Sequence, residues 1–500
     1  MSGKKKLIKK DALFFLMLVL ILLALILCSI AFKMASRNVD IRIWLDEAED
    51  IARIYDYDGA IALLEEKQSG LKLKSSELEK QTAVYHKAKE HVYEDNTKIP
   101  HIFFHSLIVD TDLAFNSPRA DSYNKDMATV SEFKNLLKQL YENNYVLVGE
   151  HDIGEETENG FVPKPIYLPE GKRPIVISQD DVNYYVVPSD AYIGYEEKNI
   201  PDAPDSYDKN MPAEGFATRL VVDDGKVMCE YTDAKGTTSV GAYDLIPILD
   251  NFVSAHPDFS YQGAKAVIAV TGFNGVFGYH NIVRSETSVT ENPEASADEI
   301  EKSNKKINAS KRHNSLYQEE CKAVREVAQC LRDSGYELAS HTYYHIHCSE
   351  QTKAEMQRDI NDWQENIGSL ISDSEHPVDI LIYPHGEDLT YQRSNTPEAV
   401  DIYEEMDTFQ PLYDAGFRYF CNIDARKSSV IQDKSQDAFQ SSQADAPVQF
   451  CTKYMRHSRK GIDGYRLTYP QDYLYDIFYD LDAIYDKSRP LQPAGYSDEY

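Results

Sequence analysis

The chain has no excess of basic residues: 52 Lys and Arg stand against 82 Asp and Glu, which gives a formal net charge of −30 at pH 7. Nucleic-acid-binding proteins carry a basic surface, so this balance argues against that class of function. An acidic surface is also poorly suited to an anionic membrane face. Cysteine is scarce as well, with 7 residues among 500 and no CxxC pair. The cysteine spacing therefore specifies no disulfide framework.

The N-terminus carries the strongest single signal. Five lysines precede a run without charge from Ala12 to Phe32, which is 21 residues long. About 20 apolar residues are needed for a helix to cross a bilayer, whereas a cleavable signal peptide has an apolar region of only about 7–15. We therefore expect a cytoplasmic tail over 1–11 and a membrane anchor over 12–32. Lysines before the span predict that everything after Lys33 lies outside the cell, in a single-pass arrangement.

Residues 33–97 read as a helical stalk, and the pattern changes from about Lys98. Leu45, Ala48, Ile51, Ala52 and Tyr55 keep one face apolar at helical spacing. Beyond the stalk, strands alternate with helices over 98–490, and this alternation favours parallel strands with helical crossovers, in a barrel or a doubly wound sheet. The expected strands are 101–104, 146–148, 175–177, 266–270, 336–340, 380–383 and 419–421.

Two insertions interrupt the alternation, near 189–262 and 284–316. The first contains RLVVDDGKVMCEY, in which Asp224-Gly225 is a good hairpin turn. The second is polar and poor in apolar residues, so we expect a surface loop there.

Three short segments with reactive side chains each follow a predicted strand: Asp180-Asp181, His341-Thr-Tyr-Tyr-His345 and Tyr383-Pro-His-Gly386. In a (β/α) architecture the carboxyl ends of the strands converge on one face, where sites are built. Two histidines four residues apart in a helical turn point the same way and can bind one ion. One aspartate would complete that ligand set, and its neighbour could take a proton from a bound water. The alternative reading of Asp180-Asp181 is a turn or helix cap.

These segments resemble the polysaccharide deacetylases of the NodB-homology type, carbohydrate esterase family four, over roughly residues 99–470. His341-Thr-Tyr-Tyr-His345 matches the family's H-[ST]-x-x-H motif in full, and Tyr383-Pro-His-Gly386 matches Y-P-x-G. Three further segments are similar in chain order to the opening strand, the T-F-D-D-G motif and the strand T-F-F-V-x-G: Ile102-Phe-Phe-His-Ser-Leu107, Ser178-Gln-Asp-Asp-Val182 and Ala266-Val-Ile-Ala-Val-Thr-Gly272.

The resemblance implies an irregular (β/α) barrel of about seven strands, preceded by the transmembrane helix and the stalk. It also implies that Asp181, His341 and His345 bind a divalent ion, zinc or another transition metal, and that Asp180 is the general base. The segment with Tyr383 and His385 would line the cleft, and the main-chain N–H of His385 would stabilise the oxyanion. Thr342 would shape the loop between the histidines.

The resemblance is incomplete at two places. Val182 stands where the family has glycine, and the late L-x-H motif, which supplies the general acid, has no full match. His457 in Met455-Arg-His457 is the nearest candidate for that acid; the alternative is a surface histidine in the basic run RHSRKG.

The implied activity is hydrolysis of N-acetyl groups on an amino-sugar polymer of a cell wall or surface, by an enzyme held at the membrane through its one helix. The alternative is an inactive barrel that keeps the fold and binds glycan or a wall-assembly partner. The sequence identifies no protein partner.

Overall fold

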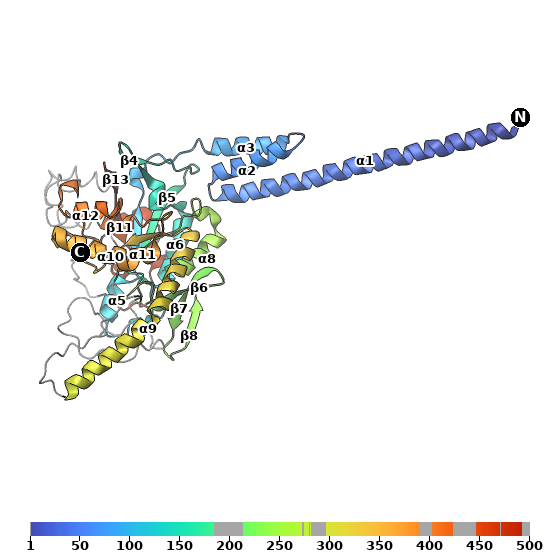
Figure 1. The fold of residues 1–500 in the computed structure, drawn as a ribbon. Coiled ribbons are helices and arrows are strands. Elements are labelled where there is room, and N and C mark those ends of the chain that lie inside the picture. Colours follow the sequence, from blue (N-terminus) through green and yellow to red (C-terminus); the bar gives the residue numbers. More distant parts are fainter. Residues whose placement is uncertain are drawn as a thin grey trace. The chain divides into compact units, whose positions relative to one another are not determined.

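The structure is a computed structural model in which two compact units are described (Figure 1). The first comprises Met1–His91 and Tyr167–Pro169, and the second comprises Val92–Ile166 and Glu170–Tyr500. The described residues are 2–184, 214–272, 275–279, 281, 297–390, 403–423, 447–470 and 472–492.

The first unit consists of three helices: α1 (Ser2–Arg53), α2 (Tyr57–Gly70) and α3 (Ser76–Ala88). The expected anchor and first stalk helix are one continuous helix, and its part from Phe14 onward is long and apolar enough to cross a membrane. Tyr55, with φ of 67°, ends α1 and starts the turn into α2. The stalk helices pack through a small core of Ala48, Ala60, Leu64 and Leu78, all fully buried.

The second unit is built on a closed barrel of seven parallel strands, which confirms the expected fold class. The order around the barrel is β1, β14, β12, β11, β10, β9 and β5, and β5 closes it by pairing with β1. The strands are β1 (His101–Phe104), β5 (Arg173–Gln179), β9 (Val267–Val270), β10 (Glu337–Ser340), β11 (Ile380–Ile382), β12 (Tyr419–Ile423) and β14 (Met455–Gly461). Outside the barrel, β2 (Tyr145–Leu147) extends β5, and β13 (Val448–Phe450) pairs antiparallel with β14.

Helices and small sheets surround this barrel. The helices are α4 (Thr111–Ala114), α5 (Ala120–Asp126), α6 (Val130–Glu142), α7 (Glu150–Ile153), α8 (Leu245–Ala255), α9 (Ala297–Asp333), α10 (Lys353–Trp363), α11 (Ser369–Ile371), α12 (Phe409–Asp414), α14 (Gly464–Thr468), α15 (Asp472–Ile477) and α16 (Leu481–Ile484). The sheets are β3 (Gly154–Thr157) with β4 (Gly160–Pro163), and β6 (Ala217–Asp223) with β7 (Lys226–Thr232) and β8 (Thr238–Gly241). A capping box of Thr129 and Glu132 starts α6.

The two expected insertions differ from their sequence description. Asp224-Gly225 turns the β6–β7 hairpin as predicted, but α8 is part of the crossover from β5 to β9, and its apolar face joins the main core. The expectation of a surface loop over 284–316 is wrong from residue 297 onward, where the chain is helical in α9. The α9 sequence contains neither Gly nor Pro and is rich in Glu, Lys and Ala, so helix propensity overrides its polarity.

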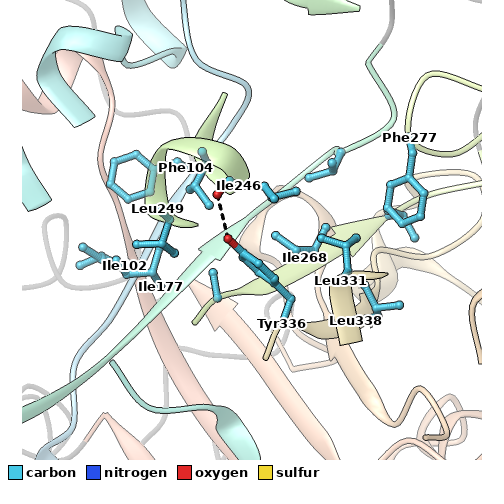
Figure 2. Packing of buried hydrophobic residues seen from close by; sticks show 14 of the residues in the cluster. Ile102, Phe104, Ile177, Ile246, Leu249, Ile268, Phe277, Leu331, Tyr336 and Leu338 are labelled. Carbon is cyan, nitrogen blue, oxygen red and sulfur yellow. Dashed lines mark hydrogen bonds between the residues drawn. The ribbon is translucent and has the colours of Figure 1, made fainter. Parts of the chain in front are cut away.

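The two faces of the barrel strands differ in character. One set of alternate residues, such as Ile102, Ile177 and Ile268, is buried against the surrounding helices (Figure 2). In the same cluster, the Tyr336 hydroxyl donates a hydrogen bond of 2.8 Å to the Ile246 carbonyl of α8 (Figure 2). The other set, which faces the barrel interior, contains polar residues including His101 and Ser178, fully buried. The apolar core therefore lies outside the barrel wall.

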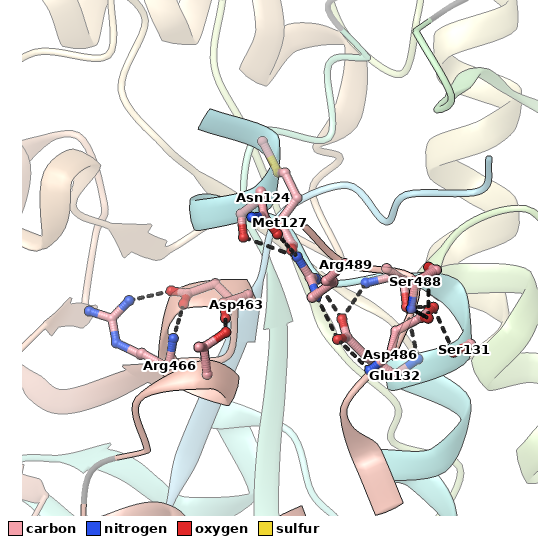
Figure 3. A network of polar contacts seen from close by, with 12 residues as sticks. Asn124, Met127, Ser131, Glu132, Asp463, Arg466, Asp486, Ser488 and Arg489 are labelled. Carbon is pink, nitrogen blue, oxygen red and sulfur yellow. Dashed lines mark hydrogen bonds and ion pairs between the residues drawn. The ribbon is translucent and has the colours of Figure 1, made fainter. Parts of the chain in front are cut away.

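A buried polar cluster attaches the end of the described chain to α5 and α6 (Figure 3). The Arg489 guanidinium donates two hydrogen bonds of 2.6 Å to the Glu132 carboxylate, and it also donates to the main-chain carbonyls of Asn124 and Met127. Asp486 accepts hydrogen bonds from Thr129 and Ser131 beside it. These contacts join segments more than 350 residues apart in the sequence.

Candidate active site

The three predicted ligands come together at the carboxyl ends of the barrel strands. Asp181 follows β5, His341 follows β10, and His345 lies four residues further along. One ligand atom from each of the three residues lies within 4.8 Å of the other two. His345 Nε2 and Asp181 Oδ2 are 3.9 Å apart, which is too long for a hydrogen bond and suits two ligands of one ion.

The His341 ring is oriented as a metal ligand requires, and both histidines are neutral. His341 Nδ1 lies 2.8 Å from the Ile382 carbonyl, which can only accept, so Nδ1 carries the hydrogen and Nε2 is left with its lone pair. Burial lowers the pKa of His341 to about 4 although Asp180 and Asp181 oppose the shift. Burial, together with the charge of His105, lowers the pKa of His345 to about 4. Both rings are therefore neutral at pH 7, as metal binding needs.

The loop between these histidines is fixed by a buried carboxylate on α10. Asp359 accepts hydrogen bonds from the main-chain N–H groups of Tyr343 (2.8 Å) and Tyr344 (2.9 Å). Thr342, at φ 58°, accepts a hydrogen bond from the Ile346 N–H through its hydroxyl. The left-handed backbone at Thr342 and His345 is thus supported from within the loop and from α10.

Asp180 lies beside the ligand set but is held separately. Its carboxylate pairs with both terminal nitrogens of Arg459 from β14, at 2.7 and 3.0 Å, and both side chains are almost completely buried. Burial raises the pKa of Asp180, but the charge of Arg459, with smaller contributions from His341 and His105, outweighs it and lowers the pKa to about 2. Asp180 is therefore an ionised proton acceptor throughout the neutral range.

The backbone explains how Val182 replaces the glycine of the family motif. The left-handed conformation falls one residue earlier, on Asp181 (φ 56°), and Asp is one of the residues that tolerate it. Val182 itself is fully buried and its N–H bonds the Ala269 carbonyl. The Asn183 side-chain amide donates a hydrogen bond to the Thr271 carbonyl and accepts one from the Thr271 N–H. The turn after β5 therefore needs no glycine at position 182.

The segment with Tyr383 and His385 reaches the site through His385 alone. His385, at φ 57°, places its ring 4.4 Å from the His345 ring and stacks on His347 at 3.8 Å. The hydrogen bonds of this turn are donated by Gly386 and Glu387, so the His385 N–H is not used by the turn. Tyr383 is fully buried and packs against Tyr403 and Phe420, which makes it a core residue rather than a cleft residue.

His457 lies in the barrel interior, away from the ligand set, and the prediction of a general acid at this position is wrong in geometry. Its Nδ1 lies 2.9 Å from Glu150 Oε1, and its Nε2 lies 2.9 Å from the Ile99 carbonyl. Both ring nitrogens are thus occupied, and the side chain is fully buried. The alternative of a surface histidine is wrong as well, since almost all of the basic run lies buried in β14.

Two residues of the site were not predicted. Arg459 lies in that basic run. Its only sequence signal is its position two residues after His457, which places both side chains on the same face of a strand. His105 follows β1, and it contributes to the pKa values of both Asp180 and His345. The alternation of His101, Phe103 and His105 along β1 is the signal that would have found it.

Comparison with known proteins agrees with this geometry. Residues 300–401, which include His341 and His345, match the family model described as polysaccharide deacetylase. This segment of the chain is similar to that family. The match and the barrel together support polysaccharide deacetylation, a hydrolase activity, for this chain.

Two solved structures are similar to this chain at 11% sequence identity. The Streptococcus pyogenes deacetylase PplD in complex with acetate covers 65% of this chain and 83% of its own, with a TM-score of 0.28. IcaB from Ammonifex degensii covers 66% and 85%, with a TM-score of 0.26. At such scores neither structure informs individual residues of the site. No curated protein matches the chain.

Proposed function

We propose that the protein is a metal-dependent deacetylase that removes N-acetyl groups from an amino-sugar polysaccharide of a cell wall or surface. The observation that carries this proposal is the convergence of Asp181, His341 and His345 beside an ionised Asp180. Two imidazoles and one carboxylate with open positions suit zinc or a similar transition metal. Such an ion, when bound, lowers the pKa of a water molecule and polarises the amide carbonyl.

The chain's own residues have separate roles in this reaction. Asp180, fixed by Arg459, accepts the proton of the attacking water. The main-chain N–H of His385 donates to the developing oxyanion. His105 takes the place first assigned to His457 and gives a proton to the leaving amine. This choice is supported by its position after β1 and its electrostatic interaction with Asp180 and His345.

The location of the reaction is part of the proposal. One long apolar N-terminal helix is compatible with a single-pass anchor. Lysines before the span favour an N-terminus in the cytoplasm and a deacetylase domain outside. A protease added to intact cells should then digest the domain and spare the N-terminal tail. A domain that is protected until the cells are opened would contradict this orientation.

The alternative of an inactive glycan-binding barrel has less support. One of its two arguments was the missing glycine at Val182, and the left-handed backbone at Asp181 accounts for that difference. The other was the uncertain general acid, and His105, the residue directly after β1, is a candidate for it.

The activity is tested on the full chain in detergent. We expect one divalent ion per chain, and acetate release from N-acetylated amino-sugar oligomers that a chelator abolishes. Asp180→Asn should keep the ion and lose about 10²- to 10⁴-fold in rate, as expected for removal of a general base. Asp482→Asn, at an exposed carboxylate on α16, is the matched control and should behave like the parent. Bound metal without acetate release, in parent and Asp180→Asn alike, would refute the enzyme hypothesis.

A further inference from the structure

A second group of side chains of the kinds that bind metal ions lies deep inside the barrel: His101, Glu150 and Cys421, all fully buried. Glu150 is on α7, which closes the amino ends of the strands through contacts with Glu337 of β10. Unlike the first group, this one already contains direct hydrogen-bond and ion-pair distances. Glu150 Oε1 lies 2.9 Å from His101 Nδ1 and 2.9 Å from His457 Nδ1.

These contacts are parts of a longer polar chain that ends at the proposed base. His101 Nε2 lies 2.8 Å from the Ser178 hydroxyl oxygen. Arg459 Nη1 donates to that same oxygen at 3.1 Å and to Asp180 at 2.7 Å. The order is therefore His457, Glu150, His101, Ser178, Arg459 and Asp180, and no member is more than 2% exposed. The chain runs from the amino to the carboxyl ends of the strands.

The donors and acceptors along these six residues can be assigned from the groups that can only donate or only accept. The Ile99 carbonyl and the Glu150 carboxylate can only accept, so both ring nitrogens of His457 donate in these contacts. His101 Nδ1 lies 2.9 Å from Glu150 Oε1 without hydrogen-bond geometry, and a hydrogen on Nδ1 is favoured there because a lone pair would repel the carboxylate. His101 Nε2 is left as an acceptor for the Ser178 O–H, and the Ser178 oxygen keeps a lone pair for Arg459.

We propose that His457, Glu150, His101 and Ser178 are positioning residues, which hold Arg459 so that Asp180 is fixed at the catalytic ion site. Arg459 has five donors and a long flexible stem, and an arginine without anchors would present its partner in many geometries. Two anchors fix its guanidinium besides Asp180: the Ser178 hydroxyl and the face of the Phe103 ring, 4.3 Å away. The buried residues His457, Glu150 and His101 hold the Ser178 hydroxyl in place. This inference rests on the proposed function.

The test uses the full chain in detergent and starts from Ser178→Ala, a small change that leaves the packing intact. We expect kcat for acetate release to fall about 10- to 100-fold, because small displacements of a catalytic group have effects of this size. KM, the metal content and the unfolding midpoint should stay at the parent values. His101→Leu should lower kcat in the same way, whereas His101→Gln, which still offers an acceptor to Ser178, should recover most of it.

Cys421→Ala is the matched control, since Cys421 contacts the same Glu150 oxygen at 3.7 Å but is not a link in the chain. It should keep the parent kcat. Parent-like kcat in both Ser178→Ala and His101→Leu would overturn the inference, and so would losses in kcat that only follow a lowered unfolding midpoint. A second ion bound per chain, lost in Cys421→Ala, would overturn it in favour of a buried metal site. An inactive parent would instead refute the proposed function.

Discussion

At the scale of single residues, Asp359 holds the loop of the proposed metal site in place. It touches neither histidine ligand, but its two carboxylate oxygens hold the main-chain N–H groups of Tyr343 and Tyr344 between them. Asp359→Asn replaces one acceptor by an NH₂ group facing an N–H, so one hydrogen bond is lost and the loop shifts. We expect the affinity for zinc to fall about 10- to 100-fold, measured by competition with a chromogenic chelator.

Asp362→Asn provides the control for this prediction. Asp362 is on the same helix and accepts a hydrogen bond from the Tyr344 hydroxyl, but it does not contact the main chain of the loop. Its zinc affinity should equal that of the parent. Equal affinity in Asp359→Asn would show that the loop holds its shape without the carboxylate.

Residue spacing indicated the proposed ligands, which the fold brings together, but not the groups that surround them. Asp180-Asp181 and His341 to His345 are local patterns, and each keeps its meaning wherever its strand lies in the barrel. Arg459 and Glu150 obtain their roles from partners 279 and 307 residues away, which no local pattern reveals. Isolated arginines and glutamates are usually exposed, so their burial here could not be expected from the sequence.

At the scale of elements, the attachment of α7 to the strand ends predicts a pH dependence of stability. His151 Nδ1 lies 2.7 Å from Glu337 of β10, and Nε2 lies 2.9 Å from Asp379, just before β11. Burial lowers the pKa of His151, but these two carboxylates outweigh it and raise the pKa well above 6.5. The stabilisation of the fold by protonated His151 is therefore complete below about pH 6.5, and it is lost as the pH rises through the raised pKa of His151.

The expected result is an unfolding midpoint that declines from about pH 6.5 upward in the parent and not in His151→Gln. Burial and the charge of Glu337 raise the pKa of Asp152 to about 6. The effect of Asp152 on stability therefore changes mainly below pH 6, outside the range in which His151 is tested. His376→Gln, at an exposed histidine paired with Asp373, should keep the decline of the parent. A decline of equal size in His151→Gln would assign it to other groups.

Elements were predicted well where their pattern was apolar and poorly where it was not. Six of the seven barrel strands carry apolar runs, and the sequence placed all six within a few residues. β14 was missed because its sequence, MRHSRKG, has the composition of a surface loop. It is a strand because Arg456 and Arg459 each find a buried carboxylate, Asp388 and Asp180, inside the fold. Expected β2 exists, but it extends β5 outside the barrel.

At the scale of the whole molecule, the contact of Arg489 with Glu132 decides whether the last described segment belongs to the cooperative unit of the barrel domain (Figure 3). Both side chains are buried, so Arg489→Leu leaves the Glu132 charge without its partner. Breaking a buried pair in this way costs about 3–5 kcal/mol. We expect a loss of that size in urea unfolding of the full chain, followed through the fluorescence of the buried Trp363.

Two further variants separate the ion pair from the packing of its side chains. Glu132→Leu combined with Arg489→Leu removes both charges, and its loss should be smaller than that of Arg489→Leu alone, because no buried charge is left unpaired. Arg466→Leu removes a guanidinium that, like its partner Asp463, keeps some contact with water, so a smaller loss than that of Arg489→Leu is expected. If Arg489→Leu behaved like Arg466→Leu, residues 485–492 would unfold separately, and the long-range closure that they provide would not stabilise the barrel.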